Sequence, residues 1–99
     1  VSGEIADRMA DIMQEMGEQN RQVISITHLP QIAAFADNHI HIEKQSADGR
    51  TVTQLTTLDY NGRLQELVRM TAGATASRAA FESATELLQG AEQIKSSLK

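Results

Sequence analysis

The chain has 99 residues and carries a formal charge of −4, so it is long enough for one domain with a modest core. Its nine Lys and Arg residues are scattered singly, which excludes an obvious basic surface for nucleic acid or anionic lipid. It has no cysteine and no apolar run of membrane-spanning length, which excludes disulfides, thiolate metal sites and a transmembrane helix, and we expect a cytoplasmic protein with an aliphatic core.

The first predicted element is an amphipathic helix that begins after Ser2, a candidate N-cap, and ends at Gly17. Apolar residues recur along it at the 3.6-residue helical spacing. We expect this stripe to pack against the core rather than to form a groove for a partner. Its members are Ile5, Ala6, Met9, Ile12, Met13 and Met16.

Residues 23–27, with the sequence VISIT, have too many consecutive apolar side chains for a half-exposed strand. They predict a strand covered on both faces, as in parallel sheets. His28 would then lie at the carboxyl end of the strand, and Pro30 would begin a short helix over residues 30–37. Ligands of open α/β sheets bind outside the carboxyl ends of the strands, so His28 with Thr27 is the best candidate site, although a lone histidine after a strand is more often structural.

A hairpin follows, because polar and apolar residues alternate over residues 39–45 and again over residues 51–58, with an Asp48-Gly49 turn between them. His39 and His41 form an H-x-H pair on one face of the first strand. Glu43 is the only other candidate metal ligand nearby in the sequence, so we expect a solvated or partly covered polar face rather than a metal site.

Two helices close the chain. The first is predicted from about Asn61 to Gly73. The second is predicted from about Thr75, with Gly90 weakening or ending it and residues 91–99 forming a polar, frayed tail. The expected inward-facing residues are Leu64, Leu67 and Val68 in the first helix, and Ala80, Phe81, Ala84, Leu87 and Leu88 in the second.

In chain order, these elements predict an α/β fold in which a crossover continues into an antiparallel ribbon, giving part of a small mixed sheet flanked by helices. No phosphate-binding loop, dinucleotide fingerprint or nucleophile elbow occurs in the sequence. The chain alone therefore has no nucleotide cradle.

Three motifs carry a resemblance: V-S-G at the start, T-H-L-P-Q at residues 27–31, and R-L-Q-E-L-V-R-M-T-A-G at residues 63–73. Together they resemble the RecN family of bacterial DNA repair ATPases, and the similarity covers nearly all 99 residues. In that family an acidic Walker B strand runs into a D-loop that ends in V-S-G, followed by a helix and a strand that ends in T-H-L-P-Q.

The resemblance implies that residues 1–90 form the C-terminal lobe of a P-loop NTPase head of the ABC type, related to the structural-maintenance-of-chromosomes (SMC) proteins. In such heads ATP and Mg²⁺ are bound between two heads. His28 matches the switch histidine near the γ-phosphate, with Thr27 beside it as a binding residue. Val1, Ser2 and Gly3 match the end of the D-loop at the head interface. No residue is implied as a metal ligand.

The family also implies a role in the DNA damage response, through double-strand-break repair and recombination, with a second head as homodimer partner. DNA would be bound through the full-length protein at the nucleoid, and no membrane is involved. The Walker motifs, the signature motif and the coiled coil would lie upstream of Val1. We therefore expect the isolated chain to be inactive and free of cofactor. We also expect it to self-associate, through pairing of the strand edge at residues 23–27, exchange of a terminal helix, or burial of the Met9, Met13 and Met16 face.

Two other interpretations stay open. A stand-alone α+β interaction module without catalysis would show the same helices and hairpin. A small metal-dependent hydrolase could use His28, His39 and His41, but it is disfavoured because a helix separates His28 from the H-x-H pair.

Overall fold

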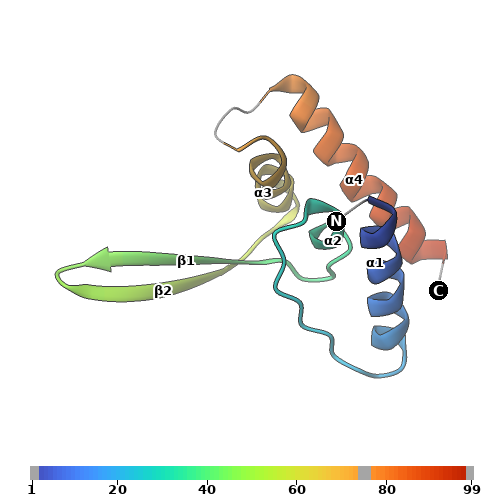
Figure 1. Ribbon diagram of the computed structural model, residues 1–99, viewed down its shortest axis with the longest axis horizontal. Helices are drawn as coiled ribbons and strands as arrows, with labels where there is room; N and C mark the ends of the chain where they lie inside the picture. The colour runs from blue at the N-terminus through green and yellow to red at the C-terminus, as the bar shows by residue number, and fades with distance from the viewer. Residues whose placement is uncertain (1–2, 74–76, 98–99) are drawn as a thin grey trace.

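A computed structural model describes residues 3–73 and 77–97 (Figure 1). Over these residues the chain forms four helices and one hairpin. The elements are α1 (Gly3–Glu18), α2 (Pro30–Ala33), β1 (Ile40–Ala47), β2 (Arg50–Thr57), α3 (Tyr60–Ala72) and α4 (Arg78–Ser97). Helix α2 lies against α1, α3 and α4, and the hairpin projects away from the helices.

The core lies where α3 and α4 pack on each other and close over α2 and the residues that follow it. Leu67 and Leu88 are its largest fully buried side chains. The core is aliphatic except for one phenylalanine, as the composition predicts. Its members are Ala10, Ala33, Ala34, Phe35, Leu64, Leu67, Val68, Ala84, Leu88 and Ala91.

Helix α3 follows the sequence prediction closely. Asp59 is its N-cap, and one side-chain oxygen, Oδ1, accepts a hydrogen bond from the Gly62 amide at 2.8 Å. Gly73 ends the helix with a φ of 66°, in the left-handed region that glycine adopts without strain. The three residues expected to face inward, at positions 64, 67 and 68, are buried, which confirms this part of the prediction.

Helix α4 differs from the prediction at its C-terminal end. The expected start at Thr75 lies outside the described residues, and the helix runs from Arg78. It continues through Gly90 to Ser97, because Ala91 and Lys95 are buried and hold its last turns against the fold. The expected end at Gly90 was therefore wrong, and the predicted frayed tail is helical as far as Ser97.

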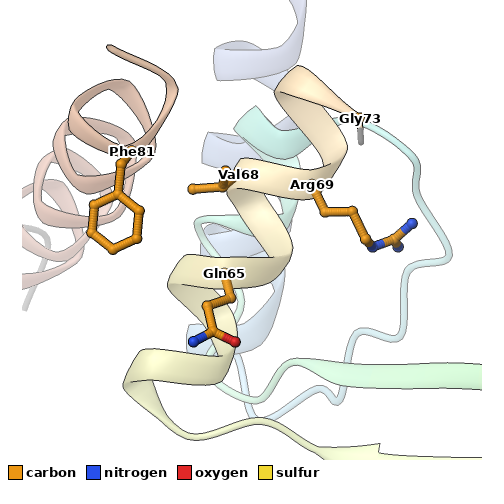
Figure 2. A pocket seen from close by; sticks show the side chains of 5 residues that line it. All are labelled: Gln65, Val68, Arg69, Gly73 and Phe81. Atoms are coloured by element: carbon orange, nitrogen blue, oxygen red, sulfur yellow. The ribbon is translucent and has the colours of Figure 1, made fainter. Parts of the chain in front are cut away.

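The inward face of α4 is confirmed at Ala84 and Leu88, and positions 80 and 87 are partly buried against the core. Phe81 is the exception, since it is 45% exposed. It lies in the first turns of α4, where it lines a small pocket of about 190 Å³ beside Val68 and the end of α3 (Figure 2).

The hairpin is confirmed. Strands β1 and β2 pair antiparallel from Ile40 opposite Thr57 to Ala47 opposite Arg50. Asp48 and Gly49 take φ values of 52° and 72°, the pair of left-handed residues that a two-residue hairpin turn requires.

The predicted strand at residues 23–27 is not formed. The segment is extended without regular secondary structure, and Ile24 and Ile26 are 82% and 94% exposed. A strand covered on both faces needs neighbours that pair with its N–H and C=O groups, and among the described residues the only ladder joins β1 to β2. The sheet is therefore a two-stranded antiparallel ribbon, and the expected crossover and mixed sheet are absent from the described part of the chain.

Helix α1 forms as predicted and ends at Glu18, one residue beyond Gly17, but its apolar stripe is largely exposed. Ala10 is buried and Met13 is half-buried. The expected burial was wrong because α1 packs mainly on α2, which has only four residues and covers little of the stripe. The exposed members are Ile5, Met9, Ile12 and Met16; Ser2 and the side chain of Ala6 lie outside what the structure describes. None of the described helices is both long and apolar enough to cross a bilayer.

Candidate functional site

The candidate site is the corner at residues 27–29, where the extended segment turns into α2. Thr27 Oγ1 accepts a hydrogen bond from the Leu29 amide at 3.0 Å, which closes a local turn around His28. Pro30 then begins α2, where its missing N–H is not needed. The predicted short helix is confirmed at its start. The Thr27 side chain is used to shape the corner, and its expected binding role is untested.

His28 is exposed at this corner and lines a broad groove of about 1290 Å³. The groove is bounded by α1, the extended segment, the base of the hairpin and the end of α4. Its lining includes the apolar residues Ile24 and Ile26 and the polar base of β1, where His39 and His41 lie. An imidazole that is accessible from a groove can contact a bound ligand, which is the minimum that the predicted role of His28 requires.

Of the predicted D-loop residues, the structure describes only Gly3. Val1 and Ser2 lie outside the described residues, and Gly3 is the first residue of α1. Their expected place at an interface between heads is therefore untested.

A second polar cluster joins the base of the hairpin to α3. His41 Nδ1 lies 3.5 Å from Glu66 Oε1, and His41 Nε2 lies 3.9 Å from Glu43 Oε1. Arg69 Nε donates to Glu66 Oε2 at 3.1 Å, and its Nη2 pairs with the other carboxylate oxygen. Sequence reasoning found the H-x-H pair and Glu43 but missed Glu66, which lies on another element and carries no motif of its own.

The surroundings of this cluster lower the pKa of two residues, Glu66 and His39. The hydrogen bond from Arg69 lowers the pKa of the Glu66 carboxyl, which is therefore ionised at neutral pH. Burial lowers the pKa of His39, and the charge of nearby Arg63 lowers it further. His39 is therefore neutral at pH 7, and its buried Nδ1 has no hydrogen-bond partner within the described structure.

These residues do not form a metal centre. No group of three His, Asp or Glu side chains in the described part of the chain is arranged to hold a metal ion. The hydrolase interpretation, which needs His28, His39 and His41 together, gains no support from this arrangement.

No protein-family model matches the chain, but curated proteins do. The DNA repair protein RecN of Bacillus subtilis is 40% identical over 95 residues, which is 96% of this chain. RecN of Deinococcus radiodurans is 44% identical over 90 residues, or 91% of the chain, and RecN of Rickettsia conorii is 40% identical over 88 residues, or 89%.

The chain is similar to RecN proteins over nearly its whole length. The resemblance that the V-S-G, T-H-L-P-Q and L-Q-E-L motifs indicate is thereby confirmed. The chain spans 16% of the length of each of these three relatives, so it corresponds to one segment of a RecN protein.

Proposed function

We propose that this chain belongs to the RecN family and is the C-terminal lobe of an ABC-type, SMC-like ATPase head that acts in DNA double-strand-break repair and recombination. The observation that carries the proposal is the match to DNA repair proteins over 89–96% of the chain. In the full-length protein, ATP and Mg²⁺ would bind between this head and a second copy.

His28 is the residue that we assign to the reaction. It is exposed beside the groove, and the Thr27 turn and Pro30 fix the backbone on either side of it. Phosphoryl transfer depends on positioning and on stabilisation of charge at the transferred phosphate. A neutral imidazole can donate a hydrogen bond from one nitrogen without adding a permanent charge, so His28 can contact a γ-phosphate and help to orient the attacking water.

The residues of this chain fit only that end of a nucleotide. The sequence contains no phosphate-binding loop, so no backbone cradle for the other phosphates can form from it. The proposal therefore assigns phosphate binding and Mg²⁺ coordination to other segments of the full-length protein. The isolated chain should bind ATP no better than roughly millimolar and should not hydrolyse it.

The exposed segment at residues 23–27 supports the same proposal. Ile24 and Ile26 are apolar and exposed, although their sequence is typical of a strand buried on both faces. Neighbouring strands supplied by other segments would bury these side chains and would place His28 at the carboxyl edge of a larger sheet, where α/β proteins bind ligands.

The test is ATP turnover by a full-length RecN polypeptide that contains this sequence. His28→Ala should lower kcat roughly 10²–10³-fold while leaving ATP binding nearly intact, as expected for the loss of one preorganised donor. Lys44→Ala is the control, because Lys44 is exposed on β1 and does not line the groove, and turnover should stay close to that of the parent protein. Unchanged turnover in His28→Ala would refute the assigned role.

A further inference from the structure

Side chains from three different helices converge on the backbone just after α2. Gln14 Nε2 of α1 donates to the carbonyl oxygen of residue 35 at 3.0 Å. Arg63 Nη2 of α3 donates to the carbonyl oxygens of residues 34 and 36 at 3.3 and 2.8 Å. Lys95 Nζ of α4 donates to the carbonyl oxygen of residue 36 at 3.2 Å. We call this arrangement, three donors on the carbonyls of residues 34–36, the carbonyl clamp.

The clamp satisfies groups that would otherwise be costly to bury. Residues 34–36 follow α2, so their carbonyls take no part in its helical hydrogen bonds and need donors from elsewhere. Ala34 and Phe35 are 1% and 7% exposed, which leaves little access for water to replace these donors. A buried carbonyl that loses its donor is destabilising by more than the same loss at the surface.

Lys95 is the most unusual member. It is 9% exposed, although lysine is among the residues least often buried. Besides the carbonyl of residue 36, its ammonium contacts Asp37 Oδ1 and Glu92 Oε1, both at 3.2 Å. A buried ammonium is tolerated only when it is paired and hydrogen-bonded, and Lys95 meets both conditions beside the turn that follows α2.

We propose that Arg63 and Lys95 are positioning residues that set the place of the His28 corner. On its N-terminal side the corner is attached to the exposed extended segment, which makes no ladder contact in the described structure. On its C-terminal side it is bonded directly to α2, because the Leu29 carbonyl accepts the amides of residues 32 and 33 at 3.2 and 3.1 Å. The corner therefore moves with α2, and the clamp fixes α2 against three helices.

The effect of the clamp on ATP hydrolysis rests on the proposed function of His28, but its effect on the stability of α2, measured by hydrogen exchange, does not. Both measurements use the full-length RecN polypeptide. Lys95→Met keeps the length of the side chain and removes the donor, and Lys95→Arg restores a cationic donor. Arg78→Met on the same helix is the control, because Arg78 is exposed and pairs with exposed Glu82 at 3.5 Å, away from the clamp.

In Lys95→Met we expect hydrogen exchange at the amides of residues 32–36 to accelerate about tenfold, because the bonds of α2 open more often when the clamp is weakened. We also expect kcat for ATP hydrolysis to fall about tenfold with KM within about twofold, since a misplaced imidazole affects the transition state more than ground-state binding. Lys95→Arg should recover most of both losses, and Arg78→Met should change neither. If Lys95 only stabilised the fold, Lys95→Met would lower stability without lowering kcat at an unchanged KM.

Unchanged exchange at residues 32–36 in a folded Lys95→Met protein would overturn the clamp. Faster exchange with unchanged kcat would overturn its role in positioning His28, while His28→Ala would still test the proposed function separately. If His28→Ala itself leaves turnover unchanged, hydrogen exchange at residues 32–36 in Lys95→Met alone decides whether the clamp fixes the corner. If Lys95→Met does not fold, Arg63→Met removes the donor to the carbonyls of residues 34 and 36, and the same two measurements apply with the same expected directions.

Discussion

The exposed side chain of Ile26 offers a quantitative contrast between the isolated chain and the full-length protein. Ile26 is 94% exposed, so Ile26→Ala removes almost no buried surface from the 99-residue chain. Surface substitutions of this kind change the free energy of unfolding by less than about 0.5 kcal/mol. In the full-length protein the proposal places the same side chain in a strand covered on both faces. Deleting buried methyl groups there should cost roughly 2–5 kcal/mol.

Leu67→Ala provides the internal standard, because Leu67 is 0% exposed in the core between α3 and α4. This substitution should cost roughly 2–5 kcal/mol in both contexts, since the core that it disrupts lies within the chain. The assay is urea unfolding of the isolated chain and thermal unfolding of the full-length protein, where a loss of this size lowers the melting temperature by several degrees. A loss below about 0.5 kcal/mol for Ile26→Ala in both contexts would refute burial of residues 23–27 in the full-length protein.

Two further predictions concern the isolated chain. Its free energy of unfolding should decrease as the pH falls below 6.5, the ordinary pKa of histidine, because His39 then binds a proton in the unfolded chain but not in the folded chain, where its pKa is lowered. His39→Gln should flatten this part of the pH profile of stability. A profile that is already flat in the parent chain would contradict the burial of His39. Glu66 adds a separate loss below pH 4.5, because its lowered pKa stabilises the fold only while the carboxylate is ionised. The chain should also self-associate at micromolar concentration through residues 23–27, since an exposed apolar segment with unpaired backbone groups is a template for strand pairing. Light scattering over a dilution series should show this association, and Ile24→Lys should weaken it; a parent chain that stays monomeric at high micromolar concentration would contradict it.

The elements with strong local signals could be predicted from the sequence. Gly73 marks the end of α3 with a left-handed residue, a signal that depends only on neighbouring residues. The Asp59 N-cap is an equally local signal, but the predicted start at about Asn61 did not use it. The Asp48-Gly49 turn defines the hairpin in the same way. Pro30 likewise marks the start of α2.

The features that depend on distant segments could not be predicted. Whether Ile24 and Ile26 are buried is decided by neighbouring strands, not by their own sequence, and the α1 stripe is exposed for the same kind of reason. Glu66 is 25 residues from His41, and no motif indicates that they meet. Lys95 is 59 residues from Ala36, and a lysine near the end of the chain is ordinarily expected in solvent.

The assignment of His28 to the γ-phosphate can be read from a single structure, that of the full-length RecN polypeptide with Mg²⁺ and a non-hydrolysable ATP analogue. We expect an imidazole nitrogen of His28 within about 3.2 Å of a γ-phosphate oxygen or of the water that lies in line with it. We also expect residues 23–27 to form a strand with neighbours on both sides. A nucleotide bound with its γ-phosphate more than about 6 Å from His28, with no water between them, would contradict the proposed role of this chain in ATP hydrolysis.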